Sequence, residues 1–314
     1  MPLHPQAQGF LTAVEAMGLP PFETLSVEEG RATIAALGGF MGEPEEVASV
    51  VDTIVPGPEV DIPLRIFMPE GEGLRPAIMY FHGGGFTTGS IDIVDPLCRA
   101  LANRSGCAVV AVGYRLAPED PYPAGVTDAY VATTWIGAKG PAFGIDNSRL
   151  AVMGDSAGAC LATVTCMALR DNADPFDIAL QVLVYPVTVM GEVDFPSRTE
   201  NADGYLLTAG MMNWFIGHYL TGCPDRADEP YCSPLLGDLA DLPPAIIVVA
   251  EYDPLRDEGI EYAKRLKEDG TFVDLRREAG MIHGFFWLGG AIDRGRELID
   301  ELGPEIGKVL RDRD

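Results

Sequence analysis

The stretch that decides the fold of this chain is Leu150-Ala151-Val152-Met153-Gly154-Asp155-Ser156-Ala157-Gly158. Its apolar run stops at Gly154 and a segment rich in alanine and leucine begins at Ala157, so the pattern predicts a strand, a tight turn at Ser156 and a helix. Because Gly154 and Gly158 lack a Cβ atom, the strand and the helix can pack closely around a strained serine. The hydroxyl would then stand at the carboxyl end of a strand, beside a helix N-terminus. The motif alone is a weak signal in a chain with 36 glycines, and an ordinary glycine-rich turn would also fit it.

Segments of strand length alternate with segments of helical periodicity on both sides of this stretch. Residues 51–55 and 60–67 alternate as one face of an antiparallel pair would, whereas 76–81 and 107–112 are continuously apolar, as strands buried on both faces are. Further strands are expected at 150–153, 178–185, 245–251 and 271–276, and helices at 95–104, 126–136, 157–169, 257–268 and 291–310. The sequence therefore predicts an α/β fold with a mostly parallel central sheet flanked by helices.

Two segments lie outside this alternation. Residues 1–45 have the pattern of two amphipathic helices, and Ser26 with Glu29 three residues later is typical of a capping box that opens the second. The insertion at 187–234 contains a helical stretch, 209–220, that is rich in aromatic residues and methionine. Such a stripe is most often core, but with the N-terminal helices it could roof the carboxyl ends of the strands, where open α/β sheets bind ligands.

The composition limits the class of protein. Of the 314 residues 47% are hydrophobic, and the mean hydropathy of +0.11 is typical of a globular protein. The net charge of −25 disfavours nucleic acids and anionic membrane surfaces as partners. We find neither a basic segment followed by an apolar one at the N-terminus nor an apolar run of bilayer length, so a cytoplasmic protein without stable membrane association is expected. The acidic, lysine-poor composition fits either salt adaptation or genome composition.

The six cysteines include no Cys-x-x-Cys pair and no zinc-ligand spacing, so no metal site is expected. Four of them lie in apolar context, as reduced core residues do: Cys98, Cys107, Cys160 and Cys166. Cys223 and Cys232 flank a loop rich in proline and aspartate and could pair, although free thiols are the expectation in a cytoplasmic protein.

A glycine-rich loop, His82-Gly83-Gly84-Gly85-Phe86, follows the strand expected at 76–81. Glycine loses more backbone entropy on ordering than other residues do, so this run indicates a loop whose N–H groups approach a ligand closely. Together with the N–H of Ala157, these groups could bind the oxyanion that forms when Ser156 attacks a carbonyl. The alternatives are a plain loop or a phosphate-binding turn, but neither Gly-x-Gly-x-x-Gly nor a Gly-Lys-Ser/Thr ending is present.

A serine nucleophile needs a base, and the chain has four histidines. His4 is in an irregular N-terminus, His218 lies within the aromatic helix, and His82 adjoins the glycines that it would shape. His283 follows the strand expected at 271–276, at the same edge of the sheet as the serine. By elimination it is the candidate base.

The base in turn needs a carboxylate that orients it. Asp253 follows the strand expected at 245–251, again at a carboxyl end. Asp-Pro before a helix is also a good N-cap, but Asp257 and Glu258 lie nearer the helix and compete for that structural role. Asp253 is therefore the candidate acid, with Glu251 in reserve.

The three candidates occur in the order Ser156, Asp253, His283, which is that of the α/β-hydrolases rather than of chymotrypsin or subtilisin. The sequence resembles the hormone-sensitive-lipase family of bacterial esterases, in its Gly-Asp-Ser-Ala-Gly branch, from about residue 50 to the C-terminus. The segments that carry the resemblance are His82-Gly83-Gly84-Gly85, Gly154-Asp155-Ser156-Ala157-Gly158, Asp253-Pro254-Leu255-Arg256-Asp257-Glu258-Gly259, His283-Gly284-Phe285, Tyr114-Arg115-Leu116-Ala117-Pro118-Glu119 and residues 201–220.

The resemblance implies a carboxylesterase with an α/β-hydrolase fold, a helical cap and no metal or organic cofactor. The implied catalytic triad is Ser156, Asp253 and His283. The implied oxyanion hole consists of Gly84, Gly85 and Ala157, with Gly83 as a further candidate donor. Side chains expected to bind the substrate are Phe86, Tyr185, Leu207, Met211 and Trp214. The expected division is cap at 1–48 and 187–234 and hydrolase core at 49–186 and 235–314.

The expected reaction is hydrolysis of small-molecule esters with short to medium acyl chains through an acyl-enzyme, by a monomer or homodimer. The same residues could hydrolyse amides or transfer acyl groups. A non-catalytic ligand receptor on this fold would be expected to have lost a member of the triad. A lipase acting at a lipid surface is disfavoured by the charge of −25.

Overall fold

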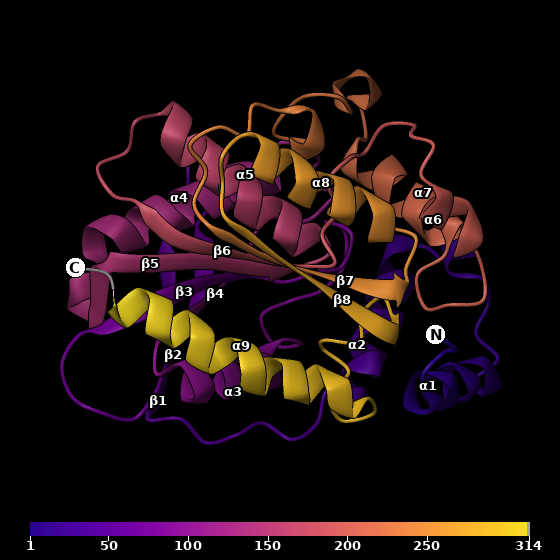
Figure 1. Ribbon diagram of the computed structural model, residues 1–314, viewed down its shortest axis with the longest axis horizontal. Helices are drawn as coiled ribbons and strands as arrows, with labels where there is room; N and C mark the ends of the chain where they lie inside the picture. Colours follow the sequence, from indigo (N-terminus) through magenta and orange to yellow (C-terminus); the bar gives the residue numbers. More distant parts are fainter. Residues whose placement is uncertain (313–314) are drawn as a thin grey trace.

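The central sheet is antiparallel at one edge and parallel elsewhere (Figure 1). The computed structural model describes residues 1–312. Its strands are β1 (Ser49–Val55), β2 (Ile62–Met68), β3 (Arg75–Phe81), β4 (Ala108–Val112), β5 (Ile145–Asp155), β6 (Ile178–Val184), β7 (Ala245–Tyr252) and β8 (Val273–Ile282). They lie in the order β1-β2-β4-β3-β5-β6-β7-β8, with β1–β2 and β2–β4 antiparallel and all other pairs parallel. The predicted α/β fold with a mostly parallel sheet is confirmed.

Helices cover both faces of this sheet (Figure 1). One face carries α3 (Asp95–Ser105) and α9 (Asp293–Arg311), and the other carries α4 (Ala124–Lys139), α5 (Ala157–Asp171) and α8 (Arg256–Glu268). Side chains of a strand alternate between the two faces. Accordingly, β3 contributes Ala77, Met79 and Phe81 to one buried cluster and Ile78 and Tyr80 to the other. Burial on both faces explains why this strand is continuously apolar.

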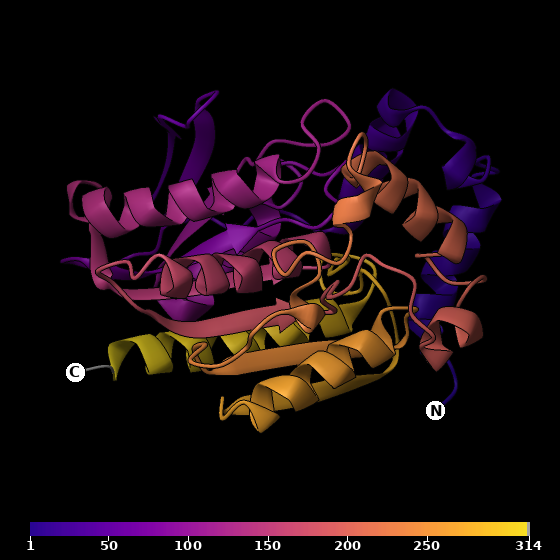
Figure 2. The same cartoon turned by 90° about the horizontal axis from the view of Figure 1, so that it is seen from above.

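The remaining α-helices gather at the carboxyl ends of the parallel strands (Figures 1 and 2). They are α1 (Pro5–Ala16), α2 (Val27–Leu37), α6 (Pro196–Glu200) and α7 (Ala209–Tyr219). Short 3-10 helices lie at Phe22–Thr24, Gly38–Phe40, Gly140–Phe143, Pro224–Arg226 and Pro234–Leu236. Ser26 and Glu29 form the predicted capping box at the start of α2. The N-terminal segment and the insertion pack on each other, since Trp214 Nε1 donates to the Leu25 carbonyl at 3.1 Å.

Two strands are longer than their apolar pattern indicates. β5 begins at Ile145, because the polar residues 146–149 continue the extended chain past a register shift beside β3. β8 continues through Arg277 and Glu278 to Ile282, and both polar residues pair with β7 at the edge of the sheet. Edge strands need only one apolar face, so the hydrophobic pattern ended before the strand did. As a result, His283 directly follows the end of β8.

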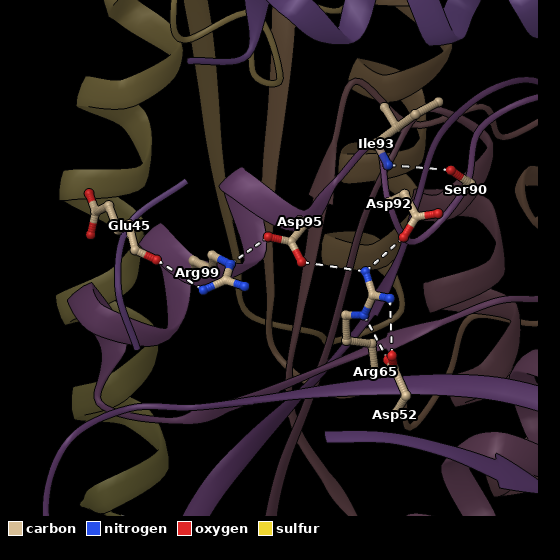
Figure 3. A network of polar contacts seen from close by, with 8 residues as sticks. All are labelled: Glu45, Asp52, Arg65, Ser90, Asp92, Ile93, Asp95 and Arg99. Carbon is tan, nitrogen blue, oxygen red and sulfur yellow. Dashed lines mark hydrogen bonds and ion pairs between the residues drawn. The ribbon is translucent and has the colours of Figure 1, made fainter. Parts of the chain in front are cut away.

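The loop that leads from the glycine-rich segment to α3 is held by a network of charges (Figure 3). Arg65 on β2 donates to Asp52 at 2.7 Å and to Asp92 at 2.8 Å, and its guanidinium lies 3.5 Å from Asp95. Asp95 also accepts from Arg99, which reaches the Glu45 carbonyl at 3.2 Å. The network joins the antiparallel edge of the sheet to the start of α3.

The contact between α3 and α9 depends on two glycines. A Cβ on Gly307 would overlap the Ser105 carbonyl, and one on Gly303 would overlap the Arg104 side chain. We expect Gly307→Ala to lower the free energy of unfolding by about 1–3 kcal/mol through overpacking. Gly9→Ala, at an exposed position of α1 where the new methyl would meet no atom of residues 1–312 within 4 Å beyond its chain neighbours and its own helix backbone, should instead raise it by about 0.5–1 kcal/mol. Urea unfolding of both variants checks the prediction, and equal effects would contradict it.

Candidate active site

Ser156 occupies the turn between β5 and α5 with a backbone conformation that residues other than glycine rarely adopt. Its φ is 53° and its ψ is −120°. The turn is tight because a Cβ on Gly154 would overlap the backbone of Gly158, and a Cβ on Gly158 would overlap the Phe81 carbonyl of β3. The Ser156 N–H donates to the Val184 carbonyl at 2.9 Å. The strain is therefore held in place by the neighbouring strands, and it places the hydroxyl at the carboxyl edge of the sheet.

The three triad candidates lie in one hydrogen-bonded series. His283 Nε2 is 3.0 Å from Ser156 Oγ, and His283 Nδ1 is 2.7 Å from Asp253 Oδ2. Asp253 is fully buried, and the other two side chains are almost so. A proton on Nδ1 that is donated to the carboxylate leaves Nε2 free to accept the serine proton. This is the geometry that a nucleophile, its base and an orienting acid require.

Asp253 combines the two roles that the sequence left open. Its Oδ1 accepts from the Leu255 N–H at 2.8 Å, which closes the turn before α8, while Oδ2 faces the histidine. Asn201, which the sequence analysis did not single out, donates to the Asp253 carbonyl at 3.1 Å. Asp257 accepts from the Ser197 N–H, and Glu251 accepts from the Gly280 N–H at 2.7 Å, so both are engaged outside the series.

The glycine-rich loop leaves selected N–H groups free. The Gly83 N–H donates to Asp155 Oδ1 at 3.0 Å and is occupied. Gly84 and Gly85 have φ values of 115° and 58°, and within residues 1–312 their N–H groups make no hydrogen bond. With the N–H of Ala157 at the start of α5, they remain as donors for an oxyanion, whereas Gly83 does not.

His82 supports this loop from behind. Its Nδ1 lies 2.7 Å from the Gly83 carbonyl, to which Nδ1–H can donate, and its ring stacks on Tyr114 at 4.4 Å. Burial lowers the pKa of His82 to about 4, so the ring is neutral around neutral pH. Asp155 accepts from the Tyr80 hydroxyl and the Gly83 N–H, and burial raises the pKa of its carboxyl. Both side chains therefore shape the loop, as the sequence indicated for His82.

A cavity of about 360 Å³ opens above Ser156 and His283. Among the predicted substrate-binding residues, Phe86, Leu207 and Met211 line it. Tyr185 and Trp214 do not: the Tyr185 ring packs on His283 at 4.5 Å, and the Trp214 ring packs between Phe22, Phe215 and His218. Lining residues that the sequence analysis missed include Leu25, Thr33, Ile34, Leu37, Ile93, Val189 and Trp287. An amphipathic stripe indicates that a helix buries one face but not which cavity that face meets.

The other candidate groups lie away from this cavity floor. His4 caps α1 by accepting from the Gln6 N–H at 3.3 Å, and His218 is half-buried against Trp214. All six cysteines are free thiols, including Cys223 and Cys232. Among the residues described, no cluster of metal-ligating side chains occurs, and no helix is both long and apolar enough to span a bilayer.

Comparison with known proteins agrees with this fold. The sheet order, the nucleophile turn and its position at the carboxyl edge are those of an α/β-hydrolase, and residues 78–287 match the family described as alpha/beta hydrolase fold. The chain is 39% identical to the carboxylic ester hydrolase LipN of Mycobacterium tuberculosis, over 98% of this chain and 84% of that protein. It is 37% identical to an ethyl acetate hydrolase of Pseudomonas putida, over 95% and 96% of the two chains.

A solved structure, the hyperthermophilic esterase of the archaeon Pyrobaculum calidifontis, superposes with a TM-score of 0.93 at 39% identity and covers 98% of this chain and 99% of that one. The chain belongs to the hormone-sensitive-lipase-like esterases of the α/β-hydrolase superfamily, and it is a carboxylic ester hydrolase.

The buried His82 predicts a pH dependence of stability. Its pKa is about 4 in the folded chain against 6.5 ordinarily, so the unfolded chain takes up a proton first as the pH falls. The stabilisation is complete above about pH 6.5 and is lost toward about pH 4, by up to about 3 kcal/mol. As the pH falls from about 6.5 to about 4, the wild type should lose unfolding free energy relative to His82→Asn. Urea titrations at several pH values test it, with His4→Asn, which keeps a capping side chain before α1, as the control, and a difference between wild type and His82→Asn that is independent of pH would contradict it.

Proposed function

We propose that this chain hydrolyses neutral esters of short to medium acyl chains through an acyl-enzyme. The proposal is carried by the series Ser156–His283–Asp253 at the floor of an apolar cavity. Of the described residues that line this cavity, none is a lysine or an arginine, and the acidic ones are Glu15 and Asp155. A carboxylate or phosphate on the substrate would therefore find no cation to pair with there, which favours a neutral ester.

In the acylation step, Ser156 Oγ attacks the ester carbonyl while His283 Nε2 takes the serine proton. Asp253 keeps the other nitrogen protonated and stabilises the imidazolium that forms. The N–H groups of Gly84, Gly85 and Ala157 would hold the oxyanion. One such donor typically lowers the activation barrier by about 3 kcal/mol. The protonated histidine then gives its proton to the departing alcohol.

In the deacylation step, water enters where the alcohol has left. His283 takes a proton from this water as it attacks the acyl-serine carbonyl, and the same N–H groups hold the second oxyanion. The collapse of this intermediate returns the proton to Ser156 and releases the carboxylic acid. The acyl chain meanwhile occupies the apolar cavity.

We further propose that residues 1–48 and 187–234 form the cap over this cavity. The proposal is supported by the lining side chains that both segments supply, such as Ile34 and Leu37 from α2 and Met211 and Phe215 from α7. The cap would exclude water from the acyl chain and limit its length.

Loss of the nucleophile should abolish turnover without unfolding the chain. We expect Ser156→Ala to lower kcat for a p-nitrophenyl ester by about 10⁴-fold or more. Exposed Ser148→Ala serves as the matched control and should keep wild-type turnover. Near-wild-type activity in Ser156→Ala would refute the mechanism. An anilide with the same acyl group, and a second alcohol added as acceptor, measure amide hydrolysis and acyl transfer by the same residues.

The cavity should impose a limit on acyl length. Each methylene buried is worth about 0.8 kcal/mol, so kcat/KM should rise with chain length until the cavity is full, at roughly four to eight carbons. Met211→Ala enlarges the cavity and should move this maximum to longer chains. Met17 is 48% exposed, and Met17→Ala should leave the maximum unchanged. A panel of p-nitrophenyl esters graded by acyl length measures the shift, and an unchanged maximum in Met211→Ala would place the acyl chain elsewhere.

A further inference from the structure

Arg31 of α2 makes four hydrogen bonds to the hydrolase core. Its Nε donates to the Thr87 carbonyl at 2.9 Å, and Nη2 donates to the Ala117 carbonyl at 3.1 Å. Nη1 donates to Glu119 Oε1 at 2.9 Å, and Nη2 donates to Glu119 Oε2 at 2.7 Å. These hydrogen bonds lower the pKa of the Glu119 carboxyl. One side chain of the N-terminal segment thus binds two separate backbone segments of the core.

Both of these backbone segments are bonded directly to the glycine-rich loop. The Thr87 N–H donates to the Gly84 carbonyl at 3.1 Å, and the Thr87 hydroxyl donates to the Gly85 carbonyl at 3.1 Å. The Ala117 N–H donates to the Phe86 carbonyl at 2.9 Å. Through Thr87 the guanidinium is therefore linked to the Gly84–Gly85 peptide group, which carries the free Gly85 N–H.

No other side chain of α2 makes such a polar link in the described part of the chain. The remaining hydrogen bonds of its side chains stay within the Ser26–Glu29 capping box. The rest of the helix meets the core through the lining of the cavity, by Thr33, Ile34 and Leu37. Arg31 is thus the polar connection between this helix and the loop.

We propose that Arg31 is a positioning residue for the oxyanion-binding loop. By fixing the Thr87 and Ala117 carbonyls when α2 is seated on the core, it holds the Gly84–Gly85 peptide group and so sets the direction of the Gly85 N–H bond. The inference rests on the proposed ester hydrolysis, because only the oxyanion of that reaction depends on these donors. It goes beyond a cap that merely shapes the acyl pocket, since it makes the N-terminal helix a determinant of the chemical step.

This role predicts where the effect of a substitution appears. Loss of one oxyanion donor typically lowers kcat by about 10²–10³-fold, so a misdirected Gly85 N–H should lower it by about tenfold or more. Binding of the ester in the ground state should change little, so KM should stay within about twofold. A residue that only latched the cap would instead change KM and the preferred acyl length.

The experiment compares four variants of the full chain using p-nitrophenyl esters of a short and a medium acyl chain and a small p-nitrophenyl phosphonate. Arg31→Ala should lower both kcat and the rate of inactivation by the phosphonate, whose oxygen needs the same donors. Arg31→Lys should be intermediate, because an ammonium cannot reach both carbonyls and the carboxylate together. Glu119→Gln should stay near wild type, since the two carbonyl contacts remain. Arg104→Ala is the matched control: it removes a similarly exposed arginine of α3, which pairs with Glu45 and with Asp300 of α9.

The outcomes decide the proposal. It is overturned if Arg31→Ala keeps the kcat and inactivation rate of Arg104→Ala, or if only KM and acyl preference change. Thermal melting is measured beside the kinetics. If Arg31→Ala does not fold, Arg31→Lys decides, because wild-type kcat in that variant also overturns the proposal. Failure of the proposed function would be distinct, since wild type would then resist the phosphonate or Ser156→Ala would remain active.

Discussion

The contact on which the site depends is that of Gly158 with the end of β3. A Cβ at this position would overlap the Phe81 carbonyl, so the first turn of α5 can approach β3 only because the residue is glycine. The approach brings the nucleophile turn beside His82 and the glycine-rich loop that follows it. The nucleophile and the free N–H groups of the glycine-rich loop belong to different βα connections, and this one close contact places them within reach of the same carbonyl.

Two buried aspartates at this edge have different partners and therefore different roles. Asp253 shares its oxygens between the Leu255 N–H and His283, so its charge is directed at the imidazole. Asp155 faces the Tyr80 hydroxyl and the Gly83 N–H, and no histidine nitrogen binds it. It acts on the shape of the glycine loop, because its bond to Gly83 fixes the peptide before the two free N–H groups. The surrounding hydrogen bonds, rather than residue type, separate an orienting acid from a structural one.

The fold and the triad candidates could be predicted from the sequence because each rests on a local signal. Continuous apolar runs mark central strands, and Ser156, Asp253 and His283 each follow a strand that the pattern reveals. The lining of the cavity could be predicted only in part, as Phe86, Leu207 and Met211, because the rest depends on how distant elements meet. Trp214 was expected to face the substrate, yet its indole donates to Leu25, far away in sequence. The bonds of Arg31 to the core are of the same long-range kind, and nothing near it in the sequence points to them.

The acyl pocket and the oxyanion donors are not independent parts of this site. A Cβ on Gly85 would overlap the Phe215 ring, so α7 rests directly on the glycine loop. The next residue, Phe86, stacks on Tyr219 of the same helix at 3.8 Å. A substitution in α7 that changes the cavity volume available to the acyl chain therefore also changes the packing against the peptide groups that would hold the oxyanion. Among the described residues, no side chain of α7 hydrogen-bonds to the triad, whose members stand at the ends of β5, β7 and β8, although Asn201 of the cap segment donates to the Asp253 carbonyl. On this architecture, evolution of acyl preference through the cap should alter the chemical step by way of the oxyanion donors more readily than by way of the triad.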